Sequence, residues 1–231
     1  SPALQQPLAL GADISMAFDD VAGLASSDRL RTKEAAERTN RWLVRCVKEF
    51  KKSVRNLPPS ARPLLFGIAQ GGLDKRLRRK SLDFVQSQEV DGIAIGGLSV
   101  GESRDEMYEI LEYLSTFYDP QRVRYLMGVG EPGDMKFAIE KGIDMFDCVL
   151  PTRNARHGSV WISGDKKINL KNTDFMKDPG PIDEKCDCST CQQRYSRAFL
   201  RHLYKTNNPL AGSLASIHNL RYLAQICETY R

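Results

Sequence analysis

The chain has 231 residues, of which 41% are hydrophobic and 27% charged, as in globular proteins that bury a core, so disordered and fibrous classes are excluded. No apolar run approaches the roughly 18 residues of a membrane span, and the N-terminal residues do not form a secretory signal. We therefore expect no membrane partner and a cytoplasmic location. The 34 Lys and Arg against 29 Asp and Glu give a net charge of +5, which permits a polyanionic partner without requiring one.

Five short apolar segments in the first 150 residues predict β-strands. They cover residues 14–18, 64–68, 92–95, 124–129 and 145–150. Continuous apolar strands are buried on both faces, which is typical of a parallel sheet.

The segments between these strands predict helices. Residues 31–54 carry one apolar stripe, and Ser103 with Glu106 forms a capping box that starts the next helix. Pro132 and Gly142 mark the start and end of a further helix. The basic run at residues 75–80 is interpreted as a solvated helix face. The resulting (β/α) repeat fits a barrel or an open doubly wound sheet, but five strands are too few for a closed eight-stranded barrel.

The alternation of predicted strands and helices ends after residue 150. Residues 161–172 read as a short hairpin, 178–183 as a loop, and about 195–205 as a helix. This part is an appended module rather than another (β/α) unit.

Three of the six cysteines, Cys186, Cys188 and Cys191, form a C-x-C-x2-C cluster. This clustering indicates metal ligation in a reducing compartment rather than a disulfide framework. With His218, the three thiolates complete a closed tetrahedral shell, the arrangement of a structural zinc site. His202 is the competing imidazole ligand, but it falls inside the predicted helix, so His218 is favoured.

Polar residues and glycines follow the predicted strands. Asp19, Gln70, Gly96-Gly97 and Asp147 come at strand ends, where (β/α) barrels place their chemistry. A single Asp after a strand more often caps the following helix, but two strands that end this way, with Gln and Gly-Gly on those between them, favour a site. Gly96-Gly97 lets the backbone approach a flat ligand, and Gln70 offers a donor and an acceptor to a heterocycle. A carboxylate such as Asp147, as nucleophile or base beside a base-shaped pocket, fits glycosidic exchange.

Long motifs carry a family resemblance through nearly the whole chain. FGIAQGG, DGIAIGGLSVGE, RYLMGVGEP, GIDMFDCVLPTR and the C-x-C-x2-C…H cluster, in this order, resemble the tRNA-guanine transglycosylases, the queuine tRNA-ribosyltransferases.

The resemblance implies an α/β protein with a TIM (β/α)8-type barrel, incomplete at the N-terminus, and a small zinc-binding subdomain. Residues 1–158 would be the C-terminal portion of the barrel, 159–218 the zinc-binding subdomain, and 219–231 the start of the closing barrel helix. The implied reaction exchanges guanine at wobble position 34 of a tRNA anticodon for a 7-deazaguanine, a queuosine precursor. Structural zinc is the implied cofactor, and the full-length protein would be a homodimer.

The site residues implied by the resemblance fall into three groups. Asp147 matches the nucleophile that attacks C1′ of the ribose, and Arg153 and Arg156 match a stretch that meets the anticodon-loop backbone. The residues matching the base pocket are Asp19, Gln70, Gly96, Gly97, Leu98, Met127 and Gly128.

The resemblance also leaves questions open. Val100 matches the bacterial branch, whereas Val21 and Ser99 match the eukaryotic pattern, so the incoming base is not fixed. Family members have a further N-terminal part with a Ser-Asp motif that supplies the general base, and a longer C-terminus. We therefore expect this chain to be truncated at both ends and inactive or very weak alone. The alternatives are a non-catalytic, zinc-containing tRNA-binding partner subunit, or a zinc-bearing RNA-binding module with a degenerate barrel.

Overall fold

The computed structural model describes residues 9–23 and 29–230, which form two compact units. The first unit comprises Ser1–Gly128 and Glu140–Phe146, and the second comprises Val129–Ile139 and Asp147–Arg231. Among the described residues, no helix is both long and apolar enough to cross a lipid bilayer.

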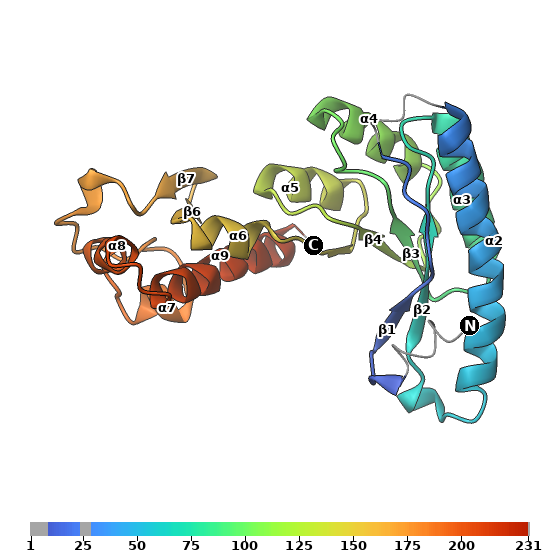
Figure 1. Ribbon diagram of the computed structural model, residues 1–231, viewed down its shortest axis with the longest axis horizontal. Coiled ribbons are helices and arrows are strands. Elements are labelled where there is room, and N and C mark those ends of the chain that lie inside the picture. Colours follow the sequence, from blue (N-terminus) through green and yellow to red (C-terminus); the bar gives the residue numbers. More distant parts are fainter. Residues whose placement is uncertain (1–8, 24–28, 231) are drawn as a thin grey trace. The chain divides into compact units, whose positions relative to one another are not determined.

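A five-stranded parallel sheet forms the centre of the first unit (Figure 1). Its strands are β1 (Ile14–Met16), β2 (Leu64–Ala69), β3 (Gly92–Ile95), β4 (Val123–Leu126) and β5 (Met145–Phe146). They are hydrogen-bonded in chain order, with Phe66 opposite Gly92 and Ile95 opposite Leu126. The predicted parallel α/β sheet is thereby confirmed, and every carboxyl-terminal strand end lies at one edge of it.

Three long helices connect these strands. They are α2 (Arg29–Val54), α3 (Lys75–Gln86) and α4 (Arg104–Ser115), with a short 3₁₀ turn η1 (Pro59–Ala61) before β2. Figure 1 shows α2 and α3 lying along one face of the sheet. On that face, a Cβ added at Gly67 would lie 2.8 Å from a Val85 methyl of α3 and 3.2 Å from Leu43 of α2. Glycine therefore allows both helices to approach β2 closely.

Helix starts follow local sequence signals. The Ser103 side chain accepts from the Glu106 N–H, and the Glu106 carboxylate accepts from the Ser103 N–H at 2.8 Å, which confirms the predicted capping box. Helix α5 (Pro132–Glu140) begins at Pro132, as predicted, and Gly142 follows it with a φ of +88°.

The second unit packs helices against a small hairpin. After α5 it contains α6 (Leu150–Arg156), β6 (Ser159–Ile162), β7 (Lys166–Asn169), η2 (Thr173–Phe175), α7 (Ser189–Gln192), α8 (Arg197–Lys205) and α9 (Leu210–Thr229). Buried Asn219 of α9 donates to the carbonyls of Pro151 and Ser159 and accepts from the Trp161 N–H. One buried side chain thus joins α6 and β6 to α9.

Several predicted boundaries were wrong by a few residues. The predicted strand 145–150 ends at Phe146, because Leu150 and Pro151 begin α6. The predicted helix 195–205 begins at Arg197, where Ser196 accepts from the Phe199 N–H as N-cap. The strands predicted at 14–18 and 124–129 are β1, which ends at Met16, and β4, Val123–Leu126.

Candidate functional site

Gln70 and Asp19 meet at the carboxyl-terminal edge of the sheet. Gln70 directly follows β2 and is buried, and its backbone N–H donates to Ser81 Oγ at 3.0 Å. Its side-chain Nε2 donates to Asp19 Oδ2 at 2.7 Å. This contact fixes the amide orientation, since the carboxylate accepts only from the nitrogen, and leaves Gln70 Oε1 as an acceptor.

The backbone of Gly96 and Gly97 lies directly against the Gln70 amide. A Cβ at Gly96 would lie 2.7 Å from Gln70 Nε2, and one at Gly97 would collide with Gln70 Oε1. Gly97 also has a φ of +63°, in the left-handed region. Any side chain at these positions would displace Gln70, so the glycines are required for this close arrangement of backbone and amide, which forms the polar surface of the site.

The other expected pocket residues of the first unit follow β3 and β4. Leu98 is buried, and the Met127 N–H donates to the carbonyl of Ile95 at 3.3 Å, which places Met127 beside the end of β3. Gly128 follows with a φ of +78°.

The adjacent carboxylates of Asp19 and Asp20 have different environments. Burial raises the pKa of Asp19, although the Gln70 hydrogen bond opposes this effect. Hydrogen bonds from Arg31, and then Arg38, lower the pKa of Asp20, whose N–H donates to Thr39 Oγ1 at 2.9 Å. Asp20 therefore anchors the loop to α2, while Asp19 is directed towards Gln70.

Arg78 of α3 was not predicted as part of the site. The basic run 75–80 was interpreted as a solvated face, yet Arg78 has 0% exposure, so that interpretation was wrong at this residue. Its guanidinium donates to the carbonyls of Ala69, Gly72, Gly96 and Gly97. These carbonyls belong to the segments that carry Gln70 and the glycine pair.

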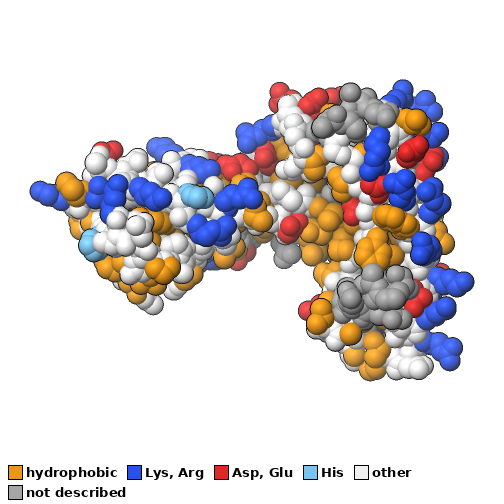
Figure 2. Space-filling model, viewed as in Figure 1, with side chains coloured by type: hydrophobic (Ala, Val, Ile, Leu, Met, Phe, Trp, Pro, Cys, Tyr) orange, Lys and Arg blue, Asp and Glu red, His pale blue; other side chains and the backbone are white. Residues whose placement is uncertain are grey.

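Asp147, Arg153 and Arg156 belong to the second unit. Asp147 is exposed and directly follows β5 in the chain. The next residue, Cys148, accepts from the Leu150 N–H at 3.2 Å, and burial raises the pKa of its thiol. Arg153 and Arg156 are exposed in the last turn of α6, three residues apart and hence on one helix face. Figure 2 shows further Lys and Arg side chains on the visible face of this unit.

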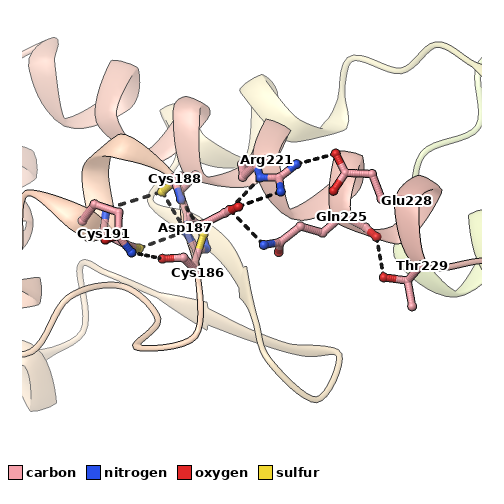
Figure 3. A network of polar contacts seen from close by, with 10 residues as sticks. Cys186, Asp187, Cys188, Cys191, Arg221, Gln225, Glu228 and Thr229 are labelled. Atoms are coloured by element: carbon pink, nitrogen blue, oxygen red, sulfur yellow. Dashed lines mark hydrogen bonds and ion pairs between the residues drawn. The ribbon is translucent and has the colours of Figure 1, made fainter.

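Cys186, Cys188, Cys191 and His218 form a buried cluster in the second unit. Figure 3 shows the three cysteines of this cluster. Their candidate ligand atoms all lie within 4.8 Å of one another, so the cluster could hold a metal ion. His218 Nδ1 lies 3.4 Å from Cys191 Sγ and 3.7 Å from Cys188 Sγ. His202, the competing ligand in the sequence, is an exposed residue of α8 outside this group.

The imidazole of His218 is oriented by the backbone of β6. His218 Nε2 lies 2.6 Å from the carbonyl oxygen of Trp161, which can only accept, so Nε2 carries a proton and Nδ1 is the ring nitrogen that faces the thiols. A backbone carbonyl on the second ring nitrogen is the usual support of a histidine that binds a metal.

The thiols of the cluster compete for protons. Hydrogen bonds from Cys186 and Cys191 lower the pKa of Cys188, whereas hydrogen bonding to Cys186 and Cys188 raises the pKa of Cys191. Sharing of protons through these hydrogen bonds thus limits ionisation to part of the cluster, and a divalent cation would allow all three thiols to ionise. The donor set of three sulfurs and one imidazole suits a cation that takes four soft ligands.

Asp187, between two of the cysteines, is clamped to α9 (Figure 3). Its carboxylate accepts from Arg221 Nε at 2.6 Å and Nη2 at 2.7 Å, and from Gln225 Nε2 at 2.9 Å. Arg221 Nη1 also donates to Glu228 at 2.7 Å. This network ties the Cys186–Cys188 turn to the helix that carries His218.

Comparisons with known proteins agree with the motifs. The family model described as queuine tRNA-ribosyltransferase matches residues 3–231. The chain is 47% identical over 222 residues to a queuine tRNA-ribosyltransferase of Herpetosiphon aurantiacus, covering 96% of this chain and 54% of that protein. It is 43% identical to the Dictyoglomus turgidum protein of that name (96% and 55% covered) and 41% identical to that of Psychrobacter cryohalolentis (99% and 58%). The chain therefore spans little more than half the length of these relatives.

Proposed function

Because the chain belongs to the queuine tRNA-ribosyltransferase family and matches bacterial members of it, we propose that it carries the base site and the nucleophile of a tRNA-guanine transglycosylase. The reaction replaces guanine 34 of a tRNA anticodon by a 7-deazaguanine. The contact of Gln70 with Asp19 on one side and the glycine pair on the other carries this proposal.

In this proposal the polar surface of the first unit binds the edge of the base. Asp19 and Gln70 supply acceptors and a fixed amide to the heterocycle, and the backbone amides of Gly97 and Leu98 donate to its carbonyl at C6. Met127 and Gly128 form part of the wall. Donors and acceptors at fixed positions discriminate between ligands, because a ligand that does not match them leaves buried polar groups unpaired and binds with lower affinity.

Asp147 is the proposed nucleophile. Its carboxylate oxygen forms a bond to C1′ of nucleotide 34 while the bond from C1′ to N9 of guanine breaks, and guanine leaves with the electron pair and takes a proton. The incoming 7-deazaguanine loses its N9 proton and attacks C1′, which releases Asp147. Two inversions at C1′ retain the configuration, and each transition state has oxocarbenium character.

Arg153 and Arg156 are proposed to bind phosphates of the anticodon loop, because guanidinium groups pair with phosphate oxygens through two hydrogen bonds. Zinc is the proposed ion of Cys186, Cys188, Cys191 and His218; with four protein ligands it stabilises the fold rather than taking part in the reaction. The division at residues 158 and 218, the completed TIM barrel and the homodimer of the full-length protein are proposed on the family resemblance.

Covalent trapping tests the proposed nucleophile. An anticodon stem-loop with guanine at position 34 is incubated with the chain, and the mixture is run on a denaturing gel. Because trapping requires only the first bond-forming step, an Asp147-dependent band of protein and RNA is expected even from a chain whose exchange activity is very weak. The band should disappear in Asp147→Asn but persist in Asp174→Asn, which removes an exposed carboxylate of the same unit. Salt-dependent RNA binding without an adduct in either chain would instead support the non-catalytic partner subunit.

A further inference from the structure

Arg78 connects the two segments that make up the base site. Its Nε donates to the Gly72 carbonyl at 2.6 Å, and its Nη1 donates to those of Ala69 at 3.2 Å and Gly96 at 2.6 Å. Its Nη2 donates to the Gly97 carbonyl at 2.8 Å. One side chain from α3 thus joins the loop after β2 to the loop after β3.

The guanidinium remains charged in its buried position. Burial lowers the pKa of Arg78 to about 10, which still leaves it protonated near pH 7. Burying a charge is unfavourable unless its hydrogen-bonding groups are satisfied, and here carbonyl dipoles surround the planar fork. Burying a charge lowers the stability of the fold, and an apolar side chain at this position would fill the same space without that penalty. Packing alone therefore does not explain an arginine here.

Peptide geometry links these carbonyls to the amides of the base site. No described peptide bond is cis, and in a planar trans peptide the C=O and the following N–H point in opposite directions. The carbonyls of Gly96 and Gly97 point to Arg78, so the N–H groups of Gly97 and Leu98 point away from it.

We infer that Arg78 is a positioning residue that sets the direction of the Gly97 and Leu98 amides and holds them in register with Gln70. The inference rests on the proposed function, in which these amides donate to the base carbonyl. Arg78 does not touch the base in this account. It acts by holding both loops through their backbone oxygens.

Discrimination between two bases tests this role more directly than affinity alone. 2-Aminopurine lacks the C6 carbonyl of guanine and the N1 proton beside it, so the preference for guanine reports on the groups that face these two atoms. The loss of preference on replacing Arg78, which leaves Asp19 and Gln70 in place, reports on the backbone donors to the oxygen. The dissociation constants of both bases are measured by calorimetry for the unsubstituted chain, Arg78→Met, Arg78→Lys and the control Arg76→Met, an exposed position of the same helix. Thermal unfolding of each chain gives the temperature range in which it is folded.

The unsubstituted chain and Arg76→Met are expected to prefer guanine by at least about tenfold, equivalent to 1.4 kcal/mol. Arg78→Met should lose most of this preference while folded, and Arg78→Lys should be intermediate, because lysine keeps the charge but not the planar fork. Should Arg78→Met fail to fold, Arg78→Lys decides.

The outcomes separate the inference from the proposed function. A folded Arg78→Met or Arg78→Lys chain that discriminates as well as the unsubstituted one refutes the positioning role alone, even if its unfolding temperature falls. An unsubstituted chain that binds neither base, or both equally, refutes the proposed base site and with it the inference.

Discussion

His218→Ala should weaken the binding of the proposed zinc ion in the second unit. A structural zinc site is worth about 10 to 16 kcal/mol, so an equal share for each of four ligands is about 2.5 to 4 kcal/mol. This corresponds to a fall in zinc affinity of roughly a hundred- to a thousandfold. The variant also removes the 2.6 Å hydrogen bond to the buried Trp161 carbonyl. This loss lowers the free energy of unfolding by about 1 to 3 kcal/mol, in addition to the effect of weaker zinc binding.

Zinc content after dialysis and competition with a chromophoric chelator measure the affinity, and thermal unfolding with and without EDTA measures the stability. The matched control is His202→Ala, because His202 is an exposed histidine of α8 and the other candidate ligand in the sequence. Zinc binding by His218→Ala at unchanged affinity, or loss of zinc in His202→Ala, would refute the assigned ligand set. An unfolding curve of the unsubstituted chain that EDTA does not move would refute a structural metal.

Three further variants test the loops and the clamp. Asp20→Asn should lower the free energy of unfolding of the first unit by about 1 kcal/mol near neutral pH, the order of partly exposed ion pairs. The pKa of Asp20 in the folded chain lies below 3.8, so this loss of stability should shrink only as the pH falls below that value. A deficit unchanged at about pH 2 in chemical unfolding would contradict the assignment. Gly97→Ala should abolish guanine binding measured by calorimetry, because the new methyl group displaces Gln70. An alanine with the left-handed φ of this position also lowers the stability by about 1 kcal/mol. The control Gly133→Ala adds a methyl group where no atom lies within 4 Å, so binding should be unchanged. Asp187→Ala should weaken zinc binding only severalfold in the chelator competition, and a loss as large as that of a ligand would show that its role is misjudged.

The parallel sheet and the grouping of three cysteines that could bind a metal could be predicted because each has a strong local signal. The strand cores are continuous apolar runs, so all five strands of the sheet were predicted. Some predicted ends were too long, because the residues after a short strand such as Met145–Phe146 belong to a turn or to the next helix. Cys186, Cys188 and Cys191 lie within six residues, and only the choice of the histidine needed a further argument, the position of His202 inside a predicted helix. The structure brings His218 to the cysteines, but His218 also lies inside a helix, α9, so the choice was right and the reason for it was wrong.

Arg78 was missed because charge and periodicity give opposite indications there. It lies in a basic run, but with Ser81, Leu82 and Val85 it occupies positions i, i+3, i+4 and i+7, the buried stripe of α3. The buried stripe, rather than the charge, predicts that the Arg78 side chain is buried.

The different environments of Asp19 and Asp20 could not be read from the sequence. The two are identical in type and adjacent, and their environments are set by Gln70, 51 residues away, and by arginines of α2. Local patterns locate such a pair at a strand end, but tertiary contacts decide which carboxylate is anchored.

The metal cluster also has a topological consequence. Cys191 and His218 are 27 positions apart, and α8 lies between them. A cation bound by both would close this stretch into a ring. While it stays bound to the denatured chain, this constraint is worth about 3.5 kcal/mol by analogy with a disulfide. Unlike a disulfide, this cross-link survives where thiols are kept reduced. If α8 detaches locally, its two ends stay tethered, so its return to the native position requires only a short search.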